Sequence, residues 1–569
     1  MPWIVGGTGF LVLLLSCGHV VGSTKEEMLA AGKSLLDKKD YNGAFQTFAK
    51  LIEMDPAFAG GYYGRGVAHA ATGDIDAAIR DFSEAIRTDP GMAHAYRNRG
   101  SAYLKKGDVT RSLLDLSNAI RLDPKDATAY VNRSAVCLTK GEFDAAISDA
   151  NEALRLDPRY AAAYCNRANG HCGKGDWDRA IADADEAIRL APDDASAYLN
   201  RSTAYGGKGD HARAIADATR AIQLDPKLAG AYSTRARVYE RLGRVGDAMQ
   251  DRARAVELDP KCTESRVCLA CLRYGTGDRD AAMKGFAEAI RLDPQSSFAR
   301  HSRGRANYEG GRMPEAISDL TEAIRLDPKD AAPHLIRGMA YLAKGDFDLA
   351  SADADQAVRL APNDPAGYLC RSAACAGKGD YPRAIADATR AIELDPKRKD
   401  AYSTRSGAYV GAGDYARAIA DATRAIEIDP NFRDGHYNRS AAHLANGDYP
   451  RAVADATRAV ELDPGCKDAY CNRAMGYEGL GKFGDALQDY ARAIKLDPRC
   501  AETYLDRAGL RYRMREFDAA LADYTEAIRL DPKLAAAYHG RGLAYEKKGD
   551  KAKAEEDFKQ AKKLGYKPQ

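Results

Sequence analysis

Residues 379–396 read GDYPRAIADATRAIELDP, and the same stretch recurs with few changes at 413–430, 447–464 and 209–226. Its closing proline belongs to a series that returns at every thirty-fourth residue from Pro56 to Pro532. A fixed period of that length is typical of a protein built from tandem repeated units. The sequence therefore predicts a long surface made of stacked copies rather than a set of separate domains.

The copy from Ala59 to Pro90 serves as a ruler, with its first residue as position 1. Apolar or small side chains fall at positions 4, 8 and 11 and again at 17, 20, 21, 24, 27 and 28, in two runs with helical spacing. Gly73 at position 15 predicts a left-handed end to the first helix, and Asp74 can then accept the free N–H groups of the second. Only Lys39 and Arg515 break the glycine rule at position 15.

This pattern resembles the tetratricopeptide repeat, which has a large residue at position 4, a small one at 8, Ala at 20 and 27, a large apolar residue at 24 and Pro at 32. The ruler copy carries these as Tyr62, Gly66, Ala78, Ala85, Phe82 and Pro90. Sixteen copies start at 25, 59, 93 and every 34 residues to 535. The resemblance implies an all-α fold, an α-α superhelical solenoid over residues 23–569, whose concave face is lined mainly by first helices.

The eighth copy, residues 263–296, departs from the pattern, with Arg266 at position 4 and Arg273 at position 11. A unit of 34 residues cannot bury enough surface to fold alone, and helices of about 14 residues are marginal in water. Neighbouring copies must therefore supply the missing core. We expect the degenerate eighth copy to be the least regular point of the solenoid.

Position 7 is Arg and position 23 is Asp in the same fourteen copies, while copies one and eight lack both. Residues that occur together in this way indicate contact. The sequence predicts an ion pair between the two helices of each repeat, or across to the adjacent one. An arginine stripe that binds anions is the disfavoured alternative, because each Arg comes with its own Asp. Representative pairs are Arg65–Asp81, Arg133–Asp149 and Arg371–Asp387.

Asparagine recurs at position 6, although its side chain competes with the helical backbone. An amide can donate to and accept from the backbone of an extended peptide, so these residues are candidates for a peptide-binding ladder on the concave face. The alternatives of a helix-to-helix hydrogen bond or a solvated amide carry equal weight. The candidate residues are Asn98, Asn132, Asn166, Asn200, Asn438 and Asn472.

Composition and motifs point away from catalysis and nucleic-acid binding. The 84 Lys and Arg nearly balance the 82 Asp and Glu, so the chain lacks the broad basic field that nucleic acids need. It has no H-E-x-x-H, P-loop, G-x-S-x-G or dinucleotide-binding fingerprint. Cys268-x-x-Cys271 with Cys262 is the one clustered thiol set, and no fourth metal ligand is evident. We predict no enzyme activity, cofactor or metal.

Residues 1–22 stand outside the repeats and resemble a secretory signal with an apolar centre from Phe10 to Leu15. The run that ends at Cys17 is similar to a bacterial lipoprotein box, which would make Cys17 the lipidated residue; plain cleavage after Gly22 is the alternative. The stretch is too short and glycine-rich for a transmembrane helix. We therefore predict export to the periplasm, cell envelope or exterior. The eleven Cys beyond Cys17 favour the cytoplasmic alternative.

Two classes of function fit these observations. The favoured one is a non-enzymatic scaffold that binds proteins or extended peptides in the concave groove, in the assembly of envelope or secreted complexes. The alternatives are a targeting arm for a separate enzyme such as a protein glycosyltransferase, and a cytoplasmic co-chaperone-like adaptor. The chaperone-binding pattern needs Lys at position 5, which no copy has; Arg97 comes nearest. The sequence leaves the oligomeric state open.

Overall fold

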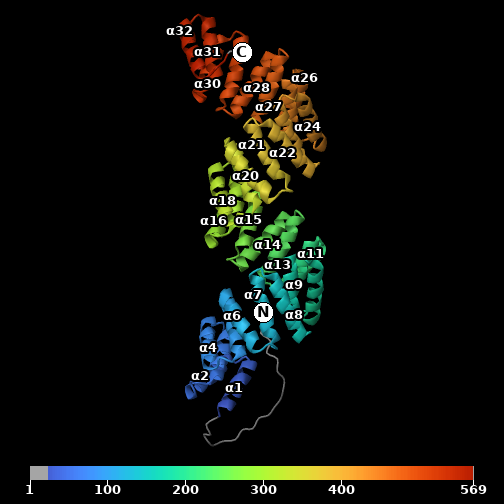
Figure 1. Ribbon diagram of the computed structural model, residues 1–569, viewed down its shortest axis with the longest axis vertical. Helices are drawn as coiled ribbons and strands as arrows, with labels where there is room; N and C mark the ends of the chain where they lie inside the picture. The colour runs from blue at the N-terminus through green and yellow to red at the C-terminus, as the bar shows by residue number, and fades with distance from the viewer. Residues whose placement is uncertain (1–23, 568–569) are drawn as a thin grey trace. The chain divides into compact units, whose positions relative to one another are not determined.

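A computed structural model describes residues 24–567, which form 32 helices and no strand. The helices come in consecutive pairs, one pair for each predicted repeat, and they follow one another along the chain in the order of the colours of Figure 1. Paired helices in tandem confirm the predicted all-α solenoid of repeated units. The described chain divides into two compact units with the boundary between Gly277 and Asp278, and each is described by itself.

Unit 1 holds the first seven repeats and the first helix of the eighth. Its helices are α1 (Lys25–Asp37), α2 (Tyr41–Met54), α3 (Ala59–Thr72), α4 (Ile75–Thr88), α5 (Ala93–Lys105), α6 (Val109–Leu122), α7 (Ala127–Thr139), α8 (Phe143–Leu156), α9 (Ala161–Lys174), α10 (Trp177–Leu190), α11 (Ala195–Lys208), α12 (His211–Leu224), α13 (Ala229–Arg241), α14 (Val245–Leu258) and α15 (Thr263–Gly275).

Unit 2 begins with the second helix of the eighth repeat and holds the remaining eight repeats. Its helices are α16 (Arg279–Leu292), α17 (Ser297–Glu309), α18 (Met313–Leu326), α19 (Ala331–Lys344), α20 (Phe347–Leu360), α21 (Pro365–Gly377), α22 (Tyr381–Leu394), α23 (Lys399–Gly411), α24 (Tyr415–Ile428), α25 (Arg433–Ala445), α26 (Tyr449–Leu462), α27 (Lys467–Gly479), α28 (Phe483–Leu496), α29 (Ala501–Arg513), α30 (Phe517–Leu530), α31 (Ala535–Lys548) and α32 (Lys551–Lys563).

The turn inside each repeat forms as the sequence predicts. Position 15 lies in the left-handed region in all sixteen repeats, with φ from +69° to +93° at the fourteen glycines. The two exceptions, Lys39 and Arg515, adopt the same conformation, with φ of +61° and +66°. A Cβ at Gly379 would meet no atom within 4 Å, so the backbone conformation, rather than a lack of space, favours glycine there.

Aspartate at position 16 begins the second helix of most repeats. The Asp380 side chain accepts a hydrogen bond from the backbone N–H of Arg383, and Asp278 accepts one from Ala281. These bonds satisfy N–H groups that would otherwise lack a partner at the helix start. Asp346 is an exception, because its side chain makes no such bond.

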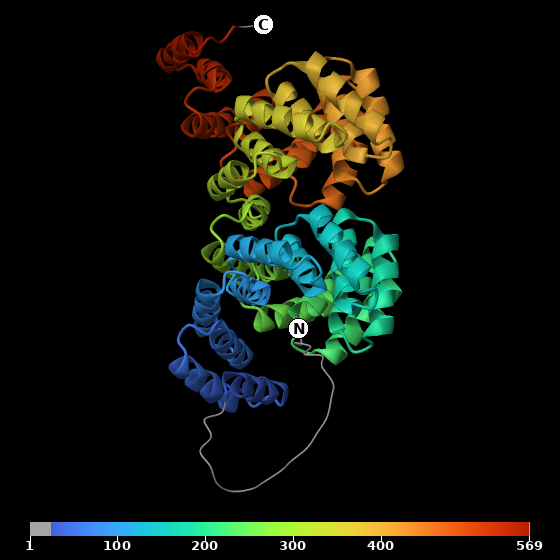
Figure 2. The same ribbon diagram turned by 60° about the horizontal axis from the view of Figure 1, so that its bottom comes forward.

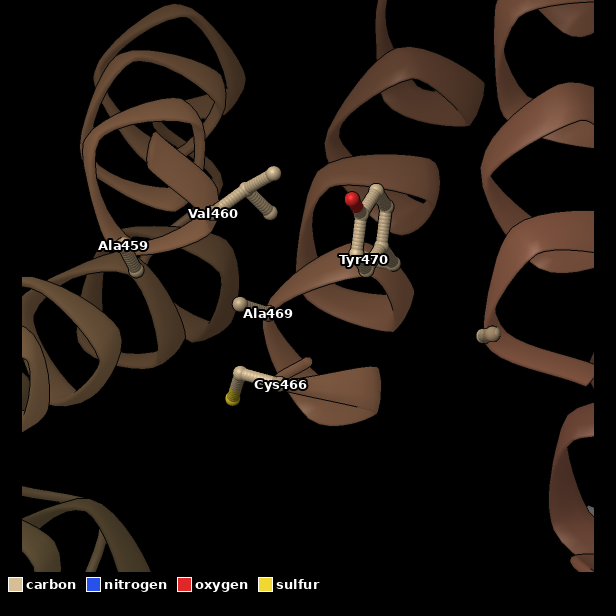
Figure 3. Close-up of a cluster of buried hydrophobic side chains, with 6 residues drawn as sticks. Ala459, Val460, Cys466, Ala469 and Tyr470 are labelled. Atoms are coloured by element: carbon tan, nitrogen blue, oxygen red, sulfur yellow. The ribbon is translucent and has the colours of Figure 1, made fainter. Parts of the chain in front are cut away.

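Cores form where the second helix of one repeat meets the first helix of the next. Figure 3 shows Ala459 and Val460 of α26 beside Ala469 and Tyr470 of α27. The alanines are fully buried, and such small side chains let helices approach closely. A single repeat thus buries part of its core only against its neighbour, as the stacking argument predicts. In both views the helix pairs of each unit follow one another in a curved stack (Figures 1 and 2).

The predicted irregular point and the division of the chain fall in the same repeat. The eighth repeat is cut by the boundary between Gly277 and Asp278. Its turn is intact, because Gly277 has a φ of +93° and Asp278 caps α16. The single uninterrupted solenoid over residues 23–569 stays a prediction.

Candidate functional site

The arginine at position 7 and the aspartate at position 23 of the same repeat form a bidentate ion pair. In repeat eleven, residues 365–398, Arg371 Nε donates to Asp387 Oδ2 at 2.8 Å and Nη2 donates to Oδ1 at 2.6 Å. The Asp387 side chain is 9% exposed and that of Arg371 is 17% exposed. The hydrogen bonds that Arg371 donates to Asp387 raise the pKa of Arg371, so the guanidinium stays charged.

The structure brings together this pair in all fourteen repeats that have both residues. Every pair is bidentate, with nitrogen–oxygen distances of 2.6–2.9 Å, including Arg65–Asp81 and Arg133–Asp149. Planar two-point bonding of this kind is the strong form of an ion pair. The pairs therefore fasten the first helix of a repeat to the second.

A second contact of the same arginines was not foreseen from the sequence. Arg371 Nη1 donates to Asp355 Oδ1 at 2.8 Å, at position 25 of the preceding repeat. Nine other arginines reach a Ser, Thr, Asn or Asp at the same position. Each of these ten arginines thus joins three helices of two repeats. The Nε and Nη2 donors of each of these arginines already bond to the paired aspartate. They are therefore not free to bind an external anion in the bidentate manner.

Tyrosine at position 4 completes the surroundings of the arginine. The Arg371 guanidinium carbon lies 5.5 Å from the centre of the Tyr368 ring, a distance at which a cation is attracted to the ring face. The equivalent contact in repeat fourteen joins Arg473 to Tyr470 at 5.4 Å. The contact recurs in all eleven repeats that have the ion pair and Tyr at position 4, whereas the other three have Arg300, His334 and His436 there.

The asparagines at position 6 use their amide nitrogens inside the protein. Asn166 and Asn200 donate to the main-chain oxygens of Val131 and Cys165, both at 2.9 Å. Each acceptor lies on the first helix of the preceding repeat, so these bonds link first helices side by side. The partner of the amide nitrogen could not be predicted from the sequence, because the acceptor is a backbone atom that every residue type has.

The other candidate asparagines vary around this arrangement. Asn438 Nδ2 donates to both Ser403 O and Ser403 Oγ at 2.8 Å. Asn98 donates to Tyr63 Oη at 3.1 Å and Asn132 to Ser101 Oγ at 2.9 Å. Asn472 is 6% exposed, and within the described residues its Nδ2 has no hydrogen-bond partner. The structure therefore joins five of the six to the preceding first helix, through different acceptors, and does not bring the six into one uniform chain of bonds.

Repeat fifteen has Asp506 at position 6, where six other repeats have Asn. Burial, followed by the charge of Glu502, raises the pKa of this carboxyl to about 6. Sequence reasoning missed Asp506 because it searched that position for a single residue type. Aligning the repeats would have revealed it, because Asp506 stands at position 6, where six other repeats have an asparagine whose amide can donate a hydrogen bond.

Four histidines and five cysteines of the described chain are buried in the helix packing. His436 at position 4 is buried, and its Nδ1 lies 3.3 Å from Asp455 Oδ1. All eleven cysteines of the described chain are free thiols. Between residues 24 and 567, no group of three or more His, Cys, Asp or Glu is arranged to hold a metal ion. No described helix is long and apolar enough to span a bilayer, and the possible lipidation residue Cys17 lies outside the described residues.

Comparisons with solved structures agree with the fold. The structure titled APC/C hetero-tetramer Cut9-Hcn1 is 15% identical over 80% of this chain and 96% of its own, with a TM-score of 0.50. At that identity it shows the fold alone. Yeast Tom70 is 17% identical over 83% of this chain and 97% of its own, with a TM-score of 0.34, which carries no further argument. A comparison with curated proteins finds no match.

Family comparisons cover most of the chain. A tetratricopeptide repeat model matches residues 29–93, 97–161, 165–229, 199–261, 335–399 and 405–465. Further models of the same repeat match residues 304–345, 468–500, 509–549 and 535–564. Together with the paired helices, these matches show that the chain belongs to the tetratricopeptide repeat family.

Proposed function

We propose that the protein is a non-enzymatic scaffold that holds extended peptides or protein partners along its first helices. The supporting observation is the run of asparagines in repeats four to six. Their amide nitrogens bond to the preceding repeat, whereas their amide oxygens accept no hydrogen bond from any described residue. An unused amide oxygen can accept a backbone N–H of a bound chain.

The spacing of the first helices suits an extended chain. Packed helices stand about 8–10 Å apart, and an extended peptide advances about 3.3 Å per residue. One asparagine would then meet about every third residue of the partner, on both sides of Asn166. The Cut9–Hcn1 structure is one in which a chain of this fold occurs in a complex with another protein.

The test separates binding from stability. Asn132→Ala with Asn200→Ala is compared with Asn151→Ala, a matched control at position 25 whose amide oxygen accepts from Arg167 Nη1 at 2.7 Å. Each lost hydrogen bond costs about 1 kcal/mol of stability. Binding to an array of extended 12-residue peptides should fall at least tenfold in the double variant and stay unchanged in the control.

Equal losses of binding in the double variant and in the control would show that these asparagines act only through folding. Unchanged binding in the double variant would remove position 6 from the binding surface. Thermal unfolding of each variant, followed by circular dichroism, measures the stability that each comparison needs.

An exported setting, in the assembly of envelope or secreted complexes, also belongs to this proposal. Its support is the signal-like composition of residues 1–22; the eleven free thiols of the described chain weigh against it, because oxidising compartments make free thiols a liability. Mass spectrometry of the mature chain decides the question. A new N-terminus at Cys17 with a lipid mass, or at Ser23 without one, is the expected result, and an N-terminus at Met1 would contradict it.

A further inference from the structure

The first helices of repeats twelve to fifteen, residues 399–534, each carry an acid at position 2. We call these four residues the acidic row: Asp400 of α23, Asp434 of α25, Asp468 of α27 and Glu502 of α29. Repeats three to six have His94, Thr128, Ala162 and Ser196 at the same position. A run of four acids is therefore a local feature of unit 2.

The acidic row lies on an open face of the first helices. The side chains of Asp400 and Asp434 are each 46% exposed, and Asp468 and Glu502 are exposed as well. Position 2 precedes position 6 by one helical turn, so the acids stand on the same helix face as the candidate asparagines. The row thus belongs to the surface on which we place the bound chain.

The helices that carry the acidic row are neighbours. Helices α23, α25 and α27 pack side by side, and Cys471 Sγ of α27 lies 3.7 Å from Thr503 Oγ1 of α29. Packed helices stand about 8–10 Å apart, and an extended chain advances about 3.3 Å per residue. A chain that crosses the row would therefore meet one acid at about every third residue.

Arginines neutralise the first half of the acidic row. Arg398 Nε donates to both carboxylate oxygens of Asp400, at 3.0 and 3.1 Å. Arg433 Nη2 lies 2.6 Å from Asp434 Oδ1. These two acids therefore already have a cation within the chain.

The second half of the acidic row has no such partner. Lys467, which precedes Asp468, donates instead to Asp497 at 2.8 Å. Glu502 accepts a hydrogen bond from the Cys500 thiol at 3.4 Å. Within the described part of the chain, no ion pair reaches Asp468 or Glu502. Their charge is left uncompensated, and such a surface attracts positive groups.

A second observation in the same half points to a bound main chain. Asn472 follows Asp468 by one turn of α27 and is 6% exposed, and among residues 24–567 its Nδ2 has no hydrogen-bond partner. In repeats five, six and thirteen the corresponding nitrogen donates to the preceding first helix. Buried polar groups are nearly always paired, and a main-chain oxygen of a bound chain can supply the missing acceptor.

We propose that the acidic row binds an extended basic segment of a partner protein, with Lys or Arg at about every third residue. This inference rests on the proposed binding of extended chains, and it names the charge of the chain that unit 2 takes. The basic side chains pair with Asp468 and Glu502, which have no cation of their own. Because the row lies open to solvent, salt weakens the attraction.

The test measures binding of the full chain to labelled 12-residue peptides by fluorescence anisotropy. The basic probe repeats Arg-Ser-Thr four times, and two matched probes carry Gln or Glu in place of every Arg. The wild-type protein should bind the basic probe at least tenfold more tightly than the Gln probe. That difference should shrink as the ionic strength rises.

Variants of the acidic row locate the binding. Asp468→Asn with Glu502→Gln removes two charges and keeps the size of both side chains. Its affinity for the basic probe should fall about fivefold, since two exposed ion pairs are lost. The charge swap Asp468→Lys with Glu502→Lys should bind the Glu probe instead of the basic one. A gain of binding in the swap cannot come from lost folding.

The matched control removes two exposed acids from the second helices of the same unit. Asp348→Asn with Asp518→Asn changes the net charge by the same amount, and the affinity for the basic probe should change less than twofold. An equal loss in the control and in the row variant would overturn the proposal, because it would assign the attraction to net charge. Unchanged affinity in the row variant would overturn it as well.

Two further outcomes separate this inference from its neighbours. If the wild type binds the basic and Gln probes equally, while Asn132→Ala with Asn200→Ala still loses binding to the peptide array, the proposed function stands and the inference fails. A mass by light scattering that rises with protein concentration, and no longer does so in the row variant, would also overturn it. The acidic row would then hold a second copy of this chain.

Discussion

Repeats eight and eleven have the same turn. Gly277 and Gly379 both lie in the left-handed region, with φ of +93° and +80°. The aspartates that follow, Asp278 and Asp380, both cap their second helices through side-chain hydrogen bonds. The local signals that make two helices from 34 residues are therefore equal in the two repeats.

The two repeats differ in the residues that fasten one helix to the other. Repeat eleven has Arg371 and Asp387, whereas repeat eight has Leu269 and Gly285 at the same positions. The boundary between the compact units falls in repeat eight, not in repeat eleven. Turn chemistry thus defines the helices of a repeat, and the division of the chain coincides with a repeat that lacks the charged pair at positions 7 and 23.

Repeat one shows that both helices of a repeat can lie in one compact unit without the ion pair. It has Ala31 and Thr47 at the pair positions, yet both of its helices lie in unit 1. Phe48 at position 24 is fully buried in a cluster with Met28 and Leu51. Repeat eight also buries a phenylalanine at position 24, Phe286, so this residue alone does not distinguish the two repeats that lack the ion pair.

The largest effect is expected from breaking the fastening of repeat eleven. Arg371→Leu leaves Asp387 buried without its counter-charge, and we expect a loss of about 3–5 kcal/mol. Removing both charges, in Arg371→Leu with Asp387→Leu, should cost less because no uncompensated charge remains. Native-state hydrogen exchange of α21 and α22 measures the local stability.

The control for these Arg371 and Asp387 variants is Asp355→Ala. This change removes the more exposed aspartate of the preceding repeat that also bonds to Arg371, and it should cost less than about 1 kcal/mol. If the two single changes, Arg371→Leu and Asp387→Leu, simply add in the double variant, the residues are not energetically coupled. The contrast between the two repeats would then need another cause.

A medium effect is expected at the helix caps of repeats eight and eleven. Because the two caps make the same hydrogen bond, we expect their removal to cost equal stability. Asp278→Ala and Asp380→Ala each remove one cap hydrogen bond and should cost about 1 kcal/mol. Asp346→Ala is the matched control, because the Asp346 side chain makes no cap bond, and its cost should be smaller. Hydrogen exchange of the first turns of α16, α22 and α20 provides the measurement. A neutral Asp278→Ala would mean that the turn of repeat eight is already weakened.

The smallest effect concerns the conformation of the turn. Arg515 holds a φ of +66° where fourteen other repeats have glycine. We expect Arg515→Gly to stabilise repeat fifteen by about 0.5–1 kcal/mol, because glycine adopts this conformation without steric cost. Gly549→Ala, in the next repeat, should destabilise by a similar amount. A shift of the urea midpoint in the same direction for both variants would contradict this explanation of position 15.

The sequence predicted helix pairs, turns and pair partners because these depend on spacing and on residues with strong local preferences. Gly379, Asp380 and Pro396 each act on the backbone within a few residues. The bond from Arg371 to Asp355 of the preceding repeat was not predicted, because the acceptor position varies among Ser, Thr, Asn and Asp. The internal bond of Asn166 is the helix-to-helix hydrogen bond that the sequence left open as an alternative. Its acceptor could not be named, because a backbone oxygen leaves no pattern in a sequence.

The bond from Arg371 to the preceding repeat makes the contacts between repeats asymmetric along the chain. Its guanidinium bonds within its own repeat and to Asp355 of the repeat before, and not to the repeat after. Trimming whole repeats from the C-terminal side would therefore leave every remaining arginine with its full set of acceptors. Trimming from the N-terminal side would remove one acceptor wherever the newly terminal arginine is one of the ten that reach the preceding repeat. The two ends of such an array are thus unequal places for shortening or extending the chain.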